Sequence, residues 1–216
     1  MKQMQEKAKF FLVLALPVAL LLAAAPAVLA QAPTPAPAAG QTTPAAAPPS
    51  GFRADFLADW DDMAKKAVRL AAAMPADKYT WHPEGARSVA EIYLHIASGN
   101  FGFMRLLGVQ PPVGIDPRTL EKSTAEKAKV VEILNQSFEQ VRQTVWNTSD
   151  ADLDKPVKLF GQPSTVRNVL YIVGTHQHEH FGLAIAYARA NGVVPPWTAE
   201  RQAQQQQPPP AQKPKP

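Results

Sequence analysis

Cysteine is missing from all 216 residues of the chain. Its absence excludes disulfide bonds, thiolate metal sites and a cysteine nucleophile. Signals for β-strands are nearly missing too, and the one short candidate is the segment 156–160. The sequence therefore indicates an all-α protein whose site chemistry cannot depend on a cysteine thiol.

A basic surface that could bind nucleic acid is also lacking. The net charge is +4, but the excess of cations belongs to the two ends of the chain. Residues 51–200 contain 16 basic and 17 acidic side chains and are close to neutral. Nucleic-acid binding needs cations gathered on one face. We therefore expect a small-molecule substrate as the partner, and a homodimer is left open.

The one long apolar run, Phe10–Leu29, predicts a secretory signal over residues 1–30. Three lysines precede the run, and small residues stand at positions −3 and −1 of a cleavage site after Ala30. The run is about long enough to span a membrane, so an uncleaved N-terminal anchor is the alternative. Two prolines and the small residues favour cleavage. We expect a periplasmic or secreted protein without stable membrane insertion after cleavage.

Composition divides the remaining chain into three parts. Residues 31–50 are an Ala/Pro-rich linker, with 13 alanines and prolines in 20 positions. Residues 51–198 are long enough for one hydrophobic core. Residues 199–216 are rich in Gln and Pro, and we expect this tail to be disordered.

Apolar residues at helical spacing predict four helices within 51–198. The expected ranges are about Phe52–Ala73, Ser88–Leu107, Thr124–Asn147, and from Ser164 or Thr165 to Asn191. Capping boxes are expected at two helix starts, formed by Ser88 with Glu91 and by Ser123 with Glu126. The loops between the helices have about 15 residues, which is long for a bundle and leaves room for a substrate pocket.

Three of the five histidines lie within five positions of the fourth predicted helix. His176 and His180 are four residues apart, so they share one face with Cβ atoms about 5–6 Å apart. That spacing lets two imidazoles bind one metal ion at about 2.0–2.1 Å. His178 is two residues from each of them and is expected to project from nearly the opposite side.

A third ligand has to come from another segment. His95 lies on or beside the apolar stripe of the second predicted helix, whereas His82 lies in a Trp-His-Pro loop. We therefore predict a metal site of His95, His176 and His180 inside the bundle. Three hydrogen-bonded core histidines are the structural alternative, but burying unpaired imidazoles is unfavourable.

Three segments of the sequence resemble the DinB-like (DinB/YfiT) superfamily of metalloenzymes. They are Arg87–Ala97, His176–Gly182 and Asn191–Trp197. The resemblance, which covers about Phe52–Trp197, implies a four-helix bundle with one metal-binding histidine on the second helix and a His-x₃-His pair on the fourth. Glu179, Phe181 and Leu183 stand where relatives often have His, Arg and Gln. The predicted triad is kept while its surroundings differ.

Three neutral imidazoles suit Zn, Ni, Cu or Fe, and they leave a coordination position open. A divalent ion there lowers the pKa of a water toward about 7 or polarises an oxygen. Glu91 and Glu179 are the candidates to orient an imidazole or act as a base, although Glu91 already has a capping role. Three tyrosines could line the pocket, but packing is the simpler account of them: Tyr93, Tyr171 and Tyr187.

Two functions follow from these expectations. The first is a metal-dependent hydrolase or transferase, because relatives include metal-dependent transferases and isomerases that use small thiols. Export does not fit such thiols, which are cytosolic. The second is a non-catalytic, stress-linked metal-binding module outside the cytoplasm. A purely structural helical domain is what remains if the chain holds no metal.

Overall fold

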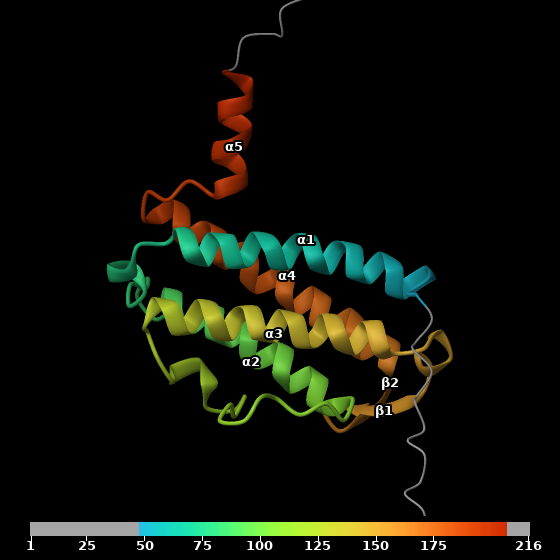
Figure 1. The fold of residues 1–216 in the computed structure, drawn as a ribbon. Helices are drawn as coiled ribbons and strands as arrows, with labels where there is room; N and C mark the ends of the chain where they lie inside the picture. The colour runs from blue at the N-terminus through green and yellow to red at the C-terminus, as the bar shows by residue number, and fades with distance from the viewer. Residues whose placement is uncertain (1–47, 207–216) are drawn as a thin grey trace, which may run out of the picture. The chain divides into compact units, whose positions relative to one another are not determined.

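The computed structural model describes residues 48–206. The predicted signal, nearly all of the predicted linker and the last ten residues lie outside this range. Five α-helices are found in it: α1 Gly51–Ala73, α2 Val89–Leu106, α3 Lys127–Asn147, α4 Val166–Ala190 and α5 Pro196–Gln205. Shorter elements fill the connections: 3₁₀ helices η1 Ala76–Lys78, η2 Leu120–Lys122 and η3 Asp150–Asp152, and strands β1 Pro156–Leu159 and β2 Gln162–Thr165 (Figure 1).

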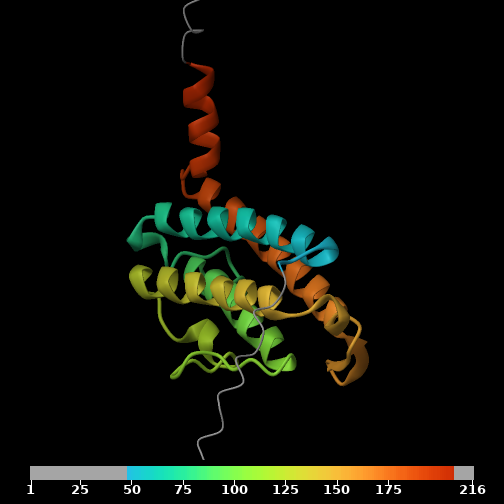
Figure 2. The ribbon, with the colours of Figure 1, turned by 45° about the vertical axis from the view of Figure 1, so that its right-hand side comes forward.

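The first four helices form a bundle, which confirms the predicted all-α architecture. α1 packs against α3 and α4, and α2 packs against the same two helices (Figures 1 and 2). The consecutive helices α1 and α2 therefore lie diagonally across the core from each other, and so do α3 and α4. Such connections must cross an end of the bundle, and this explains two of the three long loops that the sequence predicts.

The core is built from the apolar stripes that the sequence predicts. On α1, Trp60, Met63 and Leu70 are almost completely buried, with exposed fractions of 3% or less. The indole Nε1 of Trp60 donates a hydrogen bond of 3.1 Å to the carbonyl oxygen of Phe138 on α3. This bond satisfies the one polar group of a side chain that otherwise contributes apolar contact area.

One of the two predicted capping boxes is present. The hydroxyl of Ser88 accepts a hydrogen bond from the amide of Glu91 at 3.2 Å, and the Glu91 carboxylate accepts one from the Ser88 amide at 2.7 Å. The box predicted at Ser123 and Glu126 is wrong, because α3 begins at Lys127. The preceding residues turn instead into η2, which packs against α2. Ser123 ends η2 with helical backbone angles, φ −75° and ψ −29°, whereas the residue that caps a helix start is extended.

A β-hairpin precedes α4. The strands β1 and β2 are antiparallel, with Leu159 opposite Gln162, so that Phe160 and Gly161 form a two-residue turn. Both turn residues have a positive φ, 51° for Phe160 and 80° for Gly161, as the favoured two-residue hairpin turns require. The sequence predicted the first strand only. The second, with proline and serine in its middle, has a composition that does not favour a strand.

The end of α4 lies where the sequence predicts it, whereas the sequence does not predict the helix α5. Asn191 caps α4 and Gly192 has a φ of 74°, as expected for a left-handed C-terminal residue. Disorder was expected from residue 199, but α5 continues to Gln205, with a proline in its first turn. It also has an ion pair between Glu200 and Arg69 of α1, and it projects from the bundle in both views (Figures 1 and 2). Between residues 48 and 206, no helix is long and apolar enough to cross a membrane.

Candidate metal centre

The structure brings together the three histidines that the sequence singles out. His95 lies in the middle of α2, and His176 and His180 lie one turn apart on α4, which packs against it. One ring nitrogen from each of them falls within 4.8 Å of those of the other two. The Nε2 atom of His95 is 3.2 Å from that of His176 and 3.2 Å from that of His180.

These spacings suit a metal ion. Two nitrogens bound to one ion at about 2.0–2.1 Å in tetrahedral geometry lie about 3.3 Å apart, close to the two values of 3.2 Å. Hydrogen bonds among the rings explain the cluster less well. A single lone pair on His95 Nε2 cannot fully accept from both neighbours, and the buried Nδ1 atoms of His176 and His180 have no partner among the described residues. The donor set therefore fits a divalent ion.

A carboxylate fixes the tautomer of His95. The Nδ1 atom of His95 lies 2.8 Å from Oε2 of Glu121, which belongs to η2. An ionised carboxylate only accepts hydrogen bonds, so Nδ1 carries the proton and Nε2 presents its lone pair toward the other two histidines. The guanidinium Nε of Arg87 donates to the second oxygen of Glu121 at 2.7 Å. This arrangement of carboxylate and imidazole is the one that orients histidines in metal sites.

The surroundings favour the uncharged forms of His176 and His180. Burial, followed by repulsion from His180 and His95, lowers the pKa of His176 to about 4. Burial and the charge of His95 also lower the pKa of His180. Burial pushes the pKa of Glu121 upward, but hydrogen bonds from Arg87 and His95 outweigh it and hold that pKa below its usual value. Near neutral pH the centre therefore has an ionised carboxylate, and His176 and His180 are in the unprotonated form that binds metals.

His176 lies directly against the backbone of α2 at Gly99. A Cβ atom added at Gly99 would be 2.8 Å from Nδ1 of His176 and closer still to Cε1. These distances are well below ordinary contact, about 3.5–4.0 Å. Glycine is therefore required for the ring to reach its position beside His95.

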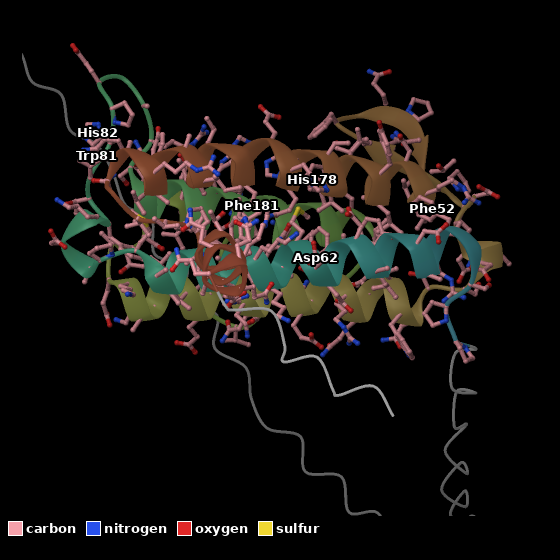
Figure 3. All side chains as sticks on the ribbon, turned by 90° about the horizontal axis from the view of Figure 1, so that it is seen from above. Phe52, Asp62, Trp81, His82, His178 and Phe181 are labelled. Atoms are coloured by element: carbon pink, nitrogen blue, oxygen red, sulfur yellow. The ribbon has the colours of Figure 1, made fainter. Side chains whose placement is uncertain are left out.

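The remaining histidines lie elsewhere. His178 is exposed and its Nε2 is 3.0 Å from Asp59 of α1 (Figure 3), so its predicted direction away from the other two is confirmed. His82 is exposed on the loop before α2, with its Nδ1 2.8 Å from the carbonyl oxygen of the next residue (Figure 3). Neither belongs to the cluster.

The two glutamates considered from sequence do not touch the cluster. The carboxylate of Glu91 is bound in the capping box, and that of Glu179 is exposed. Of the tyrosines, Tyr93 is buried in the core and Tyr171 is 59% exposed. Tyr187 lies beside Arg87 and Glu121 in a cavity of about 480 Å³, where its ring contacts that of Trp81 edge-on.

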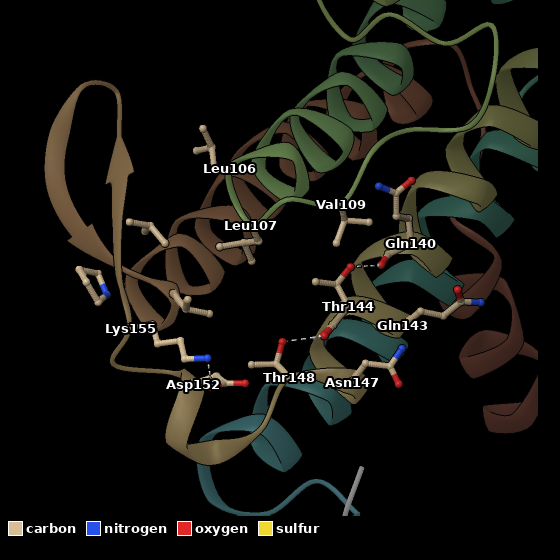
Figure 4. Close-up of a pocket in the computed structure, with 13 residues that line it drawn as sticks. Leu106, Leu107, Val109, Gln140, Gln143, Thr144, Asn147, Thr148, Asp152 and Lys155 are labelled. Carbon is tan, nitrogen blue, oxygen red and sulfur yellow. Dashed lines mark hydrogen bonds and ion pairs between the residues drawn. The ribbon is translucent and has the colours of Figure 1, made fainter. Parts of the chain in front are cut away.

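A larger cavity, of about 540 Å³, opens onto the cluster itself. His95, Gly99 and His176 form its inner end, and Phe103 with the hairpin residue Phe160 forms part of its wall. Further along α2 lies a separate cavity of about 510 Å³, between the hairpin, the end of α2 and α3 (Figure 4). None of the three clustered histidines lines that one. The two charged side chains that line it, Lys155 and Asp152, form an ion pair of 2.6 Å with each other.

Sequence reasoning missed Glu121, Arg87 and Gly99. Glu121 follows His95 by 26 residues in a loop, and nothing local marks it as a partner. Gly99 did carry a signal, because it stands on the inward stripe of α2 one turn after His95. A glycine at such a position indicates close approach of another group.

Comparisons with known proteins agree with this geometry. A family-wide sequence profile described as the DinB superfamily matches residues 59–184. Among solved structures, a DinB-like protein from Bacillus cereus superposes with a TM-score of 0.56 at 16% identity, covering 65% of this chain and 93% of the other. YfiT from Bacillus subtilis, described as a probable metal-dependent hydrolase with an unusual four-helix bundle topology, gives 0.54 at 14% identity, covering 68% and 94%. Among curated proteins, no match to the chain was found.

Proposed function

Because the chain belongs to the DinB superfamily, we propose that it is an exported metal-dependent hydrolase whose divalent ion is held by His95, His176 and His180. The observation that carries this proposal is that one ring nitrogen from each histidine lies within 4.8 Å of the other two, with Nε2 of His95 3.2 Å from that of each partner and His95 oriented by Glu121. The description of YfiT as a probable metal-dependent hydrolase supports the reaction class. Zn, Ni and Fe all suit three imidazoles.

The residues of the chain supply binding and orientation in this proposal. The three imidazoles hold the ion, which when bound lowers the pKa of a water or polarises a substrate oxygen. Glu121 and Arg87 hold the ring of His95 in place. The cavity beside Gly99 admits a small molecule to the same point. The apolar run at the N-terminus supports the proposed export, and fractionation of cells that produce the full chain would test it.

A non-catalytic metal-binding module is the second candidate, and one observation favours it. Two carboxylates near the triad are already engaged, Glu91 in the helix cap and Glu121 with His95 and Arg87, and Glu179, next to His180, is exposed to solvent. No carboxylate of the described residues lines the cavity that opens onto the cluster, where a base would have to act.

Metal analysis and a substrate screen separate the two functions. Full-length protein without a His tag would be purified, and its metal content measured by mass spectrometry for wild type, His180→Ala and His178→Ala. We expect His180→Ala to reduce the metal content to near zero, since a ligand is lost, and His178→Ala to retain it. Equal losses in the two variants would contradict the proposed ligand set. Hydrolysis of ester and amide substrates by the metal-loaded form alone supports the enzyme, and metal without turnover supports the binding module.

A further inference from the structure

The cavity beside the histidine cluster has a chemical character of its own. Its walls include Phe103 and Leu106 of α2 and Phe160 of the hairpin turn, whereas Gly102 leaves its α2 side open. Of the described residues that line it, Lys158 is the one with a permanent charge. The cavity, about 540 Å³ in volume, is within the range of small-molecule sites, which combine apolar walls with a few polar groups.

Phe160 is in an unfavourable place for a phenylalanine. Its φ of 51° lies in the left-handed region, which a bulky residue rarely adopts, and its side chain is 79% exposed. An asparagine followed by Gly161 would suit this turn better. The ring nevertheless contacts Phe103 edge-on with centroids 6.1 Å apart, and Phe103 in turn contacts His176 at 5.7 Å. A line of three rings thus runs from the hairpin turn to the cluster.

Phe160 combines an unfavourable backbone conformation with an exposed apolar side chain, and a bound ligand would explain both. Backbone strain that persists in a fold is concentrated at functional sites, and exposed apolar groups gathered at a cavity indicate a binding surface. Leu106, on the same wall, is 39% exposed although the sequence places it on the inward stripe of its helix. A bound apolar molecule would cover both side chains.

The polar groups of the cavity select the charge of that molecule. Lys158 has no carboxylate within ion-pair distance in the described part of the chain, 48–206. The hydroxyl of Ser98 is used, because it donates to the carbonyl oxygen of Pro117 at 2.6 Å. No acidic side chain lines the cavity among the residues that the structure describes. An anionic group on the ligand is thus matched by Lys158, whereas a cationic group would find no partner.

We propose that this cavity binds a small organic anion with an apolar, preferably aromatic, body, which packs against Phe103 and Phe160 with its negative group toward Lys158. The proposal deepens the proposed function and rests on it only for the conclusion that such a molecule is the substrate. The binding itself requires no metal.

Binding of 4-phenylbutyrate tests the proposal, with 4-phenylbutan-1-ol as its uncharged match. Affinities would be measured by isothermal titration calorimetry on the full-length chain, both as purified and after removal of metal with a chelator. We expect the acid to bind more tightly than the alcohol by about two- to fivefold, the usual worth of an exposed ion pair. Lys158→Gln should remove that preference while it leaves the alcohol's affinity unchanged.

Two glycines provide a matched pair of variants. A Cβ at Gly102, inside the cavity, and one at Gly182, on α4 away from it, both meet no atom within 4 Å. Leucine is a better helix former than glycine, so Gly102→Leu and Gly182→Leu should both fold, as thermal melts by circular dichroism would show. Gly102→Leu fills the cavity and should weaken both ligands at least about tenfold, and Gly182→Leu should change neither.

Phe160→Asn separates binding from folding. An Asn-Gly turn is favoured in a two-residue hairpin, so the melting temperature should stay the same or rise while the affinity for 4-phenylbutyrate falls.

The proposal is overturned if metal-free wild type binds neither ligand, if the two leucine variants weaken binding equally, or if Lys158→Gln keeps the preference for the acid. If the ligands bind as expected but the purified chain contains no metal, the cavity assignment is supported and the proposed hydrolase is refuted. If the chain contains metal but binds neither ligand, the cavity assignment is refuted and the proposed metal site is supported.

Discussion

Replacing Gly99 by alanine should damage the metal site while it leaves the fold intact. The new methyl group would lie 2.8 Å from Nδ1 of His176 and nearer to Cε1, so the ring must move by about 1 Å or more to restore ordinary contact. The ring lies at the end of a side chain with two rotatable bonds, and it borders a cavity of about 540 Å³. It can therefore swing away without a shift of the backbone.

Two contributions of opposite sign determine the expected change in the free energy of unfolding. Alanine in a helix interior is more stable than glycine by about 0.5–1 kcal/mol, while overpacking costs about 1–3 kcal/mol when the surroundings cannot adapt. With room for the ring to move, we expect a net change in the free energy of unfolding within about 1 kcal/mol. Metal affinity should respond far more, because ligand distances tolerate only about 0.2 Å. Loss of His176 as a ligand should weaken binding by about 100-fold or more, beyond the 10–100-fold typical of an outer-sphere change.

The assay is a competition titration of the chelator-treated protein with Zn²⁺ and a metal-sensitive dye, combined with urea unfolding. Gly182→Ala is the matched control, because it makes the same change inside α4 where a Cβ meets nothing within 4 Å. We expect the control to bind zinc like wild type and to be slightly more stable. Wild-type zinc affinity in Gly99→Ala would refute the argument that His176 needs the glycine, and with it the assignment of His176 as a ligand.

Two further predictions concern the charges around the cluster. Glu121→Gln should lower zinc affinity by at least about tenfold, because it removes the carboxylate that fixes the tautomer of His95; the same titration would measure this, and the exposed Glu126→Gln should have no effect. In metal-free protein, stability should fall as the pH drops from about 6.5 toward 4, because the pKa of His176 is lowered from 6.5 to about 4 and the unfolded chain then binds the extra proton. Urea midpoints between pH 7.5 and 4.5 should show a shallower pH dependence in His176→Gln, and identical slopes in the two proteins would contradict it.

Local features of the sequence were enough to predict most of the fold. Apolar residues at helical spacing located all four helices of the bundle to within a few residues. The Ser88–Glu91 box and the Asn191–Gly192 signal marked two helix ends correctly. These features act between residues a few positions apart, so no distant contact is needed to recognise them. The spacing of His176 and His180 belongs to the same class, because one helical turn places both rings on one face.

What the tertiary structure decided depends on contacts between distant segments. The 3₁₀ helix η2, which brings Glu121 to His95, lies just before α3, and α3 begins later than the sequence predicts. No local feature of that stretch indicates that it packs against α2. The cavity joins α2, α4 and a hairpin whose second strand the sequence does not reveal. By itself, the sequence determined a helical bundle with inward-facing histidines, because periodicity and capping are local. Only the tertiary structure decided which residues orient those histidines and which form the pocket beside them. Packing brings these residues together from distant parts of the chain, and no local sequence pattern indicates such contacts.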